Sequence, residues 1–560
     1  MKLDHHLNSS VTALDASNYD IVKVSAGRTL HMDQTDFILP TYHSEFAMII
    51  TEPVGKPKES TPQSTVMKKP KLMETVAKDD GTLDRINKLP ESLLARILSL
   101  LPSTKNAVRT CLVSKRWQYL WTSIDNLTLL CESPSEAEKF VPFVDYAFAQ
   151  RTNSKIRKFY LDCWDMPSYS LHIDQWLTYV IKSKVEHVVL NSTFFKVYIL
   201  PQSFYTCSSL VTLGLRNCAF DKGVVISWKS LKTVKFMTVE LDDEAIVKLL
   251  TGCPSLETME LTFFHGFHHL EIKNTNLKTL KLHNFWLLYG GDHSLQIVAP
   301  YLQHLVIPGN LDDFKCRLVN VSSLVSAELT FDIRCEIQDN SCRDYHRVFW
   351  TLVQDYLQKL RHVNELSIGT WFAEVLFMMQ LDGAQLPELK CKCLTLKLHI
   401  TKYNLYGVAS LLRASPHLET LNIHMDVEVN FLQCRYESSN LHQGDNIDLE
   451  SWISNSVFPS LKSVNIICPT FIGMCRTGRH DRLFQLSKFL LKNAKVLEKF
   501  VIMAKRTRCG LCSRNCVSAY SSGLAAKLLC CQRHSTKFMM SFHESRFCMS
   551  RMQVVLFLGT

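Results

Sequence analysis

The segment LVTLGL at residues 210–215 carries the pattern that decides the fold. An apolar residue is followed by two residues of any kind. An apolar residue, one residue of any kind and a final apolar residue complete the pattern. The same spacing begins again at residues 231, 256, 277, 302 and 324, so successive starts are 21, 25, 21, 25 and 22 residues apart. A period of about 20–29 residues indicates a chain built from repeated coils that each contain one short strand.

The spacing has a simple physical cause. Alternate side chains of an extended segment point to one side, so the last two apolar residues of each unit face a common core. The first apolar residue reaches that core from the preceding turn, and neighbouring coils cover each other's apolar faces. The pattern therefore predicts an α/β fold, in which a leucine-rich-repeat solenoid has a curved sheet with helices or turns on its convex side. Its concave face is a natural place for a protein partner.

The repeats are predicted over residues 150–455, with the first strand near Ile156. Residues 347–360 carry apolar residues at helical spacing and are predicted to form a helix inserted between two coils. Less regular units, which keep the spacing but lie further apart, begin at residues 363, 418 and 461.

A different pattern occupies residues 84–125. Pro90 suits the first turn of a helix, and Pro102 ends that helix because proline clashes with the preceding turn. Ser103 or Thr104 can cap a second helix. A third short helix is predicted around Trp117. So small a unit has a marginal core, which favours a module that docks on a partner; a helical cap on the following domain is the alternative.

The string LPESLLARILSLLPSTKNAVRTCLVSKRWQYLW, residues 89–121, resembles the F-box of the plant F-box/leucine-rich-repeat family across nearly the whole module. The resemblance implies an apolar surface that binds a Skp-type adaptor, which a cullin scaffold joins to the rest of a ubiquitin ligase. The residues that match the family's docking surface are Leu89, Pro90, Leu93, Ile97, Val108, Cys111, Val113 and Trp117.

The resemblance also implies a function. The chain would be the substrate-recognition subunit of a Skp–cullin–F-box ligase, with the repeats holding a target protein. The alternative is a repeat scaffold that binds its partner without ubiquitination. The sequence has no Gly-rich phosphate loop, no GxSxG elbow and no HExxH helix, so catalysis by this chain is not expected.

Both ends of the chain differ from the repeats. Residues 1–80 lack periodicity and are predicted to be a disordered leader. Residues 456–505 resemble the FBD region that closes many plant F-box proteins, and they are predicted to cap the last coil. Residues 506–560, rich in Cys, Ser and Met, depart from that family and are predicted to be a poorly ordered tail.

Composition bounds the remaining possibilities. The chain has 560 residues and a formal charge of +10, which is mild and argues against nucleic acid as the main partner. No apolar run approaches the ~20 residues that cross a bilayer, and no secretory signal is visible, so we expect a cytoplasmic or nuclear protein.

The cysteines and histidines offer only weak signs of a metal site. In a reducing compartment the 20 cysteines are expected to behave as small buried hydrophobic residues. The cluster Cys509, Cys512, Cys516, Cys530, Cys531 and His534 matches zinc spacing poorly. We expect no cofactor and no metal, and we expect His265, His268 and His269 to be solvated.

Overall fold

In the computed structural model, all described residues lie within the range Asp79–Thr560. The predicted leader 1–80 lies outside the described residues. The structure describes residues 86, 88–131, 133–151, 155–192, 197–221, 223–264, 266–285, 294–310, 315–332, 342–381, 383–398, 402–425, 457–468, 480–505, 516–531, 538–546 and 549–558.

The N-terminal module is helical, as predicted, but its third helix is not continuous. Helix α2 (Glu91–Leu98) begins directly after Pro90, and α3 (Thr104–Arg109) is capped by the Ser103 hydroxyl, which accepts from the Asn106 N–H at 3.3 Å. The predicted second helix ends in one 3-10 turn, and the predicted third helix is replaced by two more. Short turns suit this stretch because they bring both tryptophans, Trp117 and Trp121, into one small core. The turns are η1 (Thr110–Leu112), η2 (Lys115–Trp117) and η3 (Leu120–Ser123).

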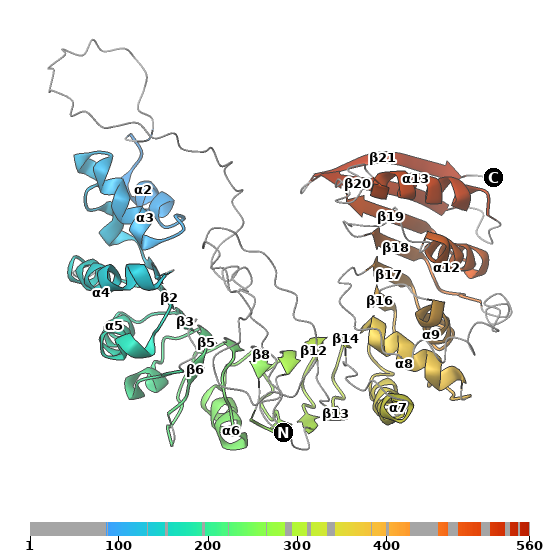
Figure 1. Ribbon diagram of the computed structural model, residues 1–560, viewed down its shortest axis with the longest axis horizontal. Helices are drawn as coiled ribbons and strands as arrows, with labels where there is room; N and C mark the ends of the chain where they lie inside the picture. Colours follow the sequence, from blue (N-terminus) through green and yellow to red (C-terminus); the bar gives the residue numbers. More distant parts are fainter. Residues whose placement is uncertain are drawn as a thin grey trace, which may run out of the picture. The chain divides into compact units, whose positions relative to one another are not determined.

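Among the described residues, a 16-stranded sheet runs through the rest of the fold (Figure 1). Its strands follow the order of the chain and pair in parallel until the last pair, β20 and β21, which is antiparallel. The strands are β1 (Asn126–Cys131), β2 (Lys158–Cys163), β3 (His187–Ser192), β5 (Thr212–Arg216), β7 (Thr233–Met237), β8 (Thr258–Phe264), β10 (Thr279–Phe285), β12 (His304–Asn310), β14 (Ser326–Asp332), β15 (Glu365–Gly369), β16 (Cys393–Leu398), β17 (Thr420–Met425), β18 (Ser463–Cys468), β19 (Lys499–Lys505), β20 (Phe538–Arg546) and β21 (Met549–Leu558).

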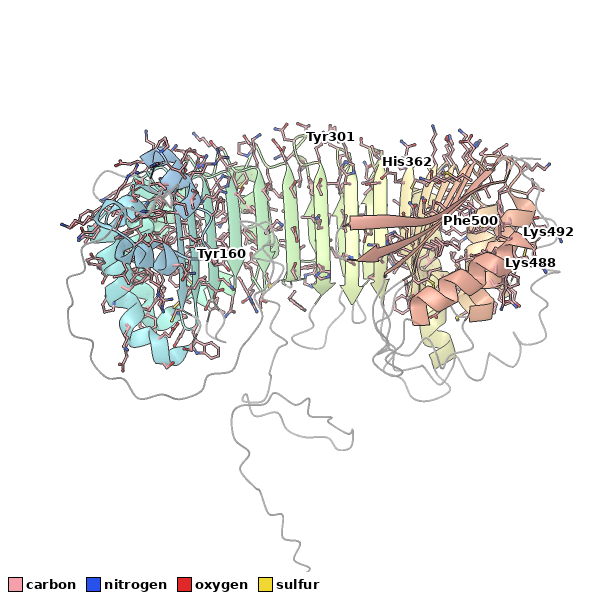
Figure 2. The ribbon with its side chains drawn as sticks, turned by 90° about the horizontal axis from the view of Figure 1, so that it is seen from above. Tyr160, Tyr301, His362, Lys488, Lys492 and Phe500 are labelled. Carbon is pink, nitrogen blue, oxygen red and sulfur yellow. The ribbon has the colours of Figure 1, made fainter. Side chains whose placement is uncertain are left out.

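Equivalent positions of successive repeats lie side by side, which confirms the predicted solenoid. Leu213 pairs with Val234, Val234 with Met259 and Met259 with Leu280, and all four side chains are fully buried. Figure 2 shows the strands in this side-by-side arrangement. The period in the sequence therefore corresponds to a row of core side chains in space. Each coil contributes one member of the row, and the neighbouring coils cover it.

The return segments lie on the outer side of the sheet (Figure 1). The helix predicted over residues 347–360 is confirmed as α7. Two small parallel sheets, β4–β6 and β9–β11–β13, replace helices in the middle coils. Their strands are β4 (Tyr198–Ile199), β6 (Cys218–Ala219), β9 (His269–Glu271), β11 (Ser294–Val298) and β13 (Lys315–Asn320). The helical returns are α4 (Pro134–Ala149), η4 (Pro167–Tyr169), α5 (Ser170–Lys182), η5 (Gln202–Thr206), α6 (Asp243–Gly252), α7 (Cys342–Lys359), α8 (Thr370–Leu381), α9 (Lys402–Arg413), α12 (His480–Asn493) and α13 (Cys516–Leu529).

The sheet begins earlier than the predicted boundary at residue 150. Strand β1 directly follows the helical module, and it pairs in register with β2 from Asn126↔Lys158 to Cys131↔Cys163. Ile124, Leu127 and Leu129 have the repeat spacing and are buried. The signal was present in the sequence, but a single unit close to the module does not reveal a period.

The sheet also continues past the predicted end. Residues 456–505 are an interior unit and not the last coil, because β20 pairs in parallel with β19 from Lys499↔Met539 to Lys505↔Ser545. The prediction of a poorly ordered tail is wrong for α13 and β20, since Leu524, Leu528 and Met540 are buried in the main core. Position 537, where the repeat pattern requires an apolar residue, is a lysine, so the spacing did not reveal this unit.

A close contact between α8 and α9 makes a testable demand on Gly407. A β-carbon at this position would lie 2.0 Å from the Ala373 carbonyl oxygen and 3.2 Å from the Phe377 nitrogen. We expect Gly407→Ala to cost about 2–3 kcal/mol through overpacking and to lower the thermal unfolding midpoint followed by circular dichroism.

Gly523 in α13 is the matched control for this change. A β-carbon there meets nothing within 4 Å, so Gly523→Ala should be neutral or stabilising by about 0.5–1 kcal/mol. Equal midpoints for the two variants would contradict the assigned contact.

Candidate functional site

The first candidate site is the outer surface of the N-terminal module. Leu94 and Leu98 of α2 are buried in the module's own core, whereas Leu93 and Ile97 on the adjacent face are 45% and 42% exposed. A helix of eight residues does not need apolar side chains on both faces to fold. Its second apolar face is therefore available to a partner.

The segment after α3 adds further apolar surface. Leu112 is 86% exposed and Val113 is 64% exposed, at the end of the short turn η1. The Arg116 guanidinium donates to the Leu89 carbonyl at 2.6 Å, which fixes the start of α2 against η2. The exposed residues thus project from a module whose turns are held together by this hydrogen bond. We call Leu93, Ile97, Leu100, Leu112 and Val113 the docking face.

The predicted adaptor-binding residues fall into three groups by exposure. Pro90, Leu93, Ile97 and Val113 are exposed, while Leu89, Val108 and Cys111 are half-buried. Trp117 is only 6% exposed and packs in the module's core, so its predicted place on the docking surface is corrected: it supports the surface from beneath. A tryptophan side chain has a large apolar area, so its burial contributes much of the stability of so small a core.

Sequence reasoning missed several exposed apolar residues of the module. Leu100 is 76% exposed and follows Leu93 by seven residues, so helical spacing from Leu93 and Ile97 could have found it. Leu112 could not be found in this way because it lies on a 3-10 turn. The missed residues are Ile86, Leu100, Leu112 and Tyr119.

The second candidate site is the face of the sheet opposite the helices. Side chains between the buried positions form rows across the strands. Thr212, Thr233, Thr258 and Thr279 stand side by side in register. Their hydroxyl side chains make this row polar.

Charged side chains occupy the next row. Lys235 and Lys281 flank Glu260, with ammonium nitrogens 3.2 and 4.0 Å from the same carboxylate oxygen. Further along, the Lys397 ammonium lies 2.6 Å from Glu328. Burial, and then the nearby Lys397 ammonium, lower the pKa of His424, which is therefore neutral at physiological pH. This face of the sheet therefore presents side chains of both charges, held in position by the paired strands.

Amides bridge the later strands. The Asn465 side chain donates to the Asn422 carbonyl oxygen at 2.8 Å, and the Asn422 amide donates to the Thr395 hydroxyl at 3.3 Å. Cross-strand pairs of this kind contribute about 0.2–1 kcal/mol each, so they stabilise the sheet modestly and hold the polar surface in one arrangement.

Most described cysteines of the repeats lie in the core, whereas Cys393 is half-buried and Cys530 is exposed. Burial raises the pKa of Cys218, Cys253 and Cys316 to about 12, so these thiols stay protonated and unreactive. The other described cysteines are free as well. The residues Cys509, Cys512 and His534 of the weak zinc pattern lie outside the described part of the chain.

Within the described ranges, no group of three or more His, Cys, Asp or Glu residues could hold a metal ion. The backbone N–H groups of His268 and His269 donate to Asp243 Oδ1 at 2.9 and 3.1 Å, and the His268 ring is 61% exposed. His265 lies outside the described residues. Of the described helices, none is long and apolar enough to cross a membrane.

Comparison with known proteins matches both parts of the chain. Residues 86–129 match the family model of the F-box domain, and residues 148–544 match the model of the At1g61320/AtMIF1 LRR domain. The F-box/LRR-repeat protein At5g02910 of Arabidopsis thaliana is 30% identical over 451 residues, covering 76% of this chain and 89% of the relative. The F-box/LRR-repeat protein At3g03360 of the same plant is 30% identical over 354 residues, covering 61% and 70%.

Proposed function

Because the chain belongs to the F-box/leucine-rich-repeat family, we propose that it is the substrate-recognition subunit of a Skp–cullin–F-box ubiquitin ligase. The F-box has an interaction role, and the repeats form a surface suited to a protein. In the proposed complex the docking face binds a Skp-type adaptor, the adaptor binds a cullin, and the concave face binds the target.

The observation that carries the proposal is the second apolar face of α2. A side chain such as Leu93 or Ile97 gains free energy when a partner removes it from water, at about 25 cal/mol per Å² of apolar surface. Neither of these residues belongs to the module's buried core. An adaptor that covers them would account for their exposure in the isolated chain.

The proposed mechanism is proximity. The chain binds the adaptor at one end and the target along the sheet, so ubiquitin transfer becomes effectively intramolecular. The thioester chemistry takes place on other subunits, and this chain is a non-catalytic part of the ligase. The array would act in the cytoplasm or the nucleus.

The proposal is tested by purifying the tagged full chain together with a Skp-type adaptor and a cullin–RING pair, and then measuring the lifetime of the proteins that it captures. A stable complex with the adaptor is expected, and the captured proteins should persist longer in cells that lack the chain. Capture without adaptor, and with unchanged lifetimes, would favour the alternative: a repeat scaffold that acts without ubiquitination.

A further inference from the structure

The F-box core is completed by the repeat array. Ala147, in the first outer helix α4, is fully buried in the same small core as Leu94, Leu98 and Trp117. One residue earlier, Tyr146 stacks on Trp121 with ring centroids 6.3 Å apart. The module therefore shares its interior with the first coil.

Hydrogen bonds join the same two parts. The Thr104 hydroxyl, at the start of α3, accepts from the Thr128 backbone N–H of β1 at 2.9 Å. Thr104 is 2% exposed, so water does not compete for this bond. At the surface, the Lys105 ammonium lies 3.3 Å from Glu136 of α4. We call this set of contacts the joint.

Arg151 lies at the centre of the joint. It follows α4 and is 1% exposed, although arginine is among the residues least often buried. Its guanidinium donates to the Trp121 carbonyl at 3.2 Å and to the Ile124 carbonyl, both at the end of η3. Its own carbonyl accepts from the Tyr179 hydroxyl of α5 at 2.7 Å. Arg151 thus connects the F-box to α4 through its side chain and to α5 through its backbone carbonyl.

The charge of Arg151 persists despite its burial. Desolvation lowers the pKa of its guanidinium to about 10, which leaves it protonated at neutral pH. The carbonyls at the end of a helical turn carry partial negative charge and lack partners within the turn. A planar cation with several donors can satisfy two such carbonyls at once, whereas a lysine ammonium is a single point.

We propose that Arg151 is a positioning residue that fixes the F-box, and with it the docking face, in one orientation against the repeat array. The functional importance of this orientation rests on the proposed ligase role, because a receptor that presents its target to a distant active site needs a defined geometry. The fixed joint itself is a property of this chain alone.

The test measures the distance between the two parts in the full chain. Spin-labelled amino acids are encoded at the exposed residues Lys115 in the F-box and Lys229 in the array, because the 20 cysteines exclude thiol labelling. A single narrow distance distribution is expected for the otherwise unaltered chain, and at least a doubling of its width for Arg151→Met. Arg151→Lys keeps the positive charge but lacks the planar guanidinium that donates to two carbonyls at once, so it should give an intermediate width.

The matched control is Arg157→Met. Arg157 is close in sequence, and its exposed guanidinium pairs with Asp125 at 2.9 Å on the surface. This variant should keep the narrow distribution. All variants should bind the Skp-type adaptor within about twofold, because none alters the docking face.

A narrow distribution in Arg151→Met would overturn the proposal. If that variant unfolds the F-box, Arg151→Lys decides in its place: a width as narrow as that of the unaltered chain would likewise overturn the proposal. If the unaltered chain fails to bind the adaptor, the ligase role fails, while the distance distributions still test the joint.

Discussion

A chain that carries Leu93→Glu and Ile97→Glu is expected to lose binding to a Skp-type adaptor by at least about 100-fold. Both side chains are about half exposed on the docking face, and glutamate is as good a helix former as leucine, so α2 should stay folded. Binding would have to bury two carboxylates in place of two apolar groups. The lost burial and the desolvation of the charges together cost about 3 kcal/mol or more.

Isothermal titration calorimetry with purified adaptor measures the effect. Val247→Glu is the matched control, because Val247 is 53% exposed on an outer helix, α6, far along the chain from the F-box. It should leave the dissociation constant unchanged. An unchanged constant in the double variant, with circular dichroism intact, would remove the docking face from the proposal.

The array was predictable because its signal is repeated. Leu213, Val234, Met259 and Leu280 occupy one row of the core, and each repeat of the spacing strengthens the same conclusion.

The ends of the array were not predictable in this way. A first or last unit has only one neighbour, so its pattern has repeats on one side only. In the last unit, the lysine at position 537 also interrupts the pattern. The docking face was predicted in part. Leu93 and Ile97 are exposed as predicted, whereas Trp117 is buried. A family resemblance assigns residues to a surface, but it does not distinguish the exposed ones from those that pack beneath them.

The joint could not have been predicted from sequence. Arg151 has no motif, and its partners are backbone carbonyls, which every residue possesses. Only the fold brings the end of α4 next to the end of η3. Interactions of side chains with backbone across elements carry almost no sequence signal, although they decide how two parts of a chain are oriented.

A chain that ends at Lys505 is expected to lose order in its last coils and to aggregate. The truncation removes Leu524, Leu528 and Met540, which are buried against the unit of β19, and at about 1.5–3 kcal/mol each they contribute about 5 kcal/mol or more. It also removes the Lys527 ammonium, which lies 5.7 Å from the centre of the Phe484 ring on α12.

The consequences follow from the position of β19 in the sheet. Phe500, labelled in Figure 2, is fully buried in this strand, while Lys488 and Lys492 of α12 are exposed on the outside. Without β20, the N–H and C=O groups of β19 that pair with residues 539–545 face water. An exposed parallel edge is a template for pairing with another chain.

Hydrogen–deuterium exchange of peptides from β18 and β19, with light scattering, measures the outcome. Faster exchange by at least tenfold and growing scatter are expected for the chain that ends at Lys505. A chain that ends at Arg546 is the matched control, because it keeps the β19–β20 pairing and removes only the antiparallel strand β21. Equal exchange in the two truncated chains would show that residues 506–546 are not needed by the last coils. Faster exchange in the shorter chain alone would establish α13 and β20 as the terminal repeat, which closes the core that the earlier units share.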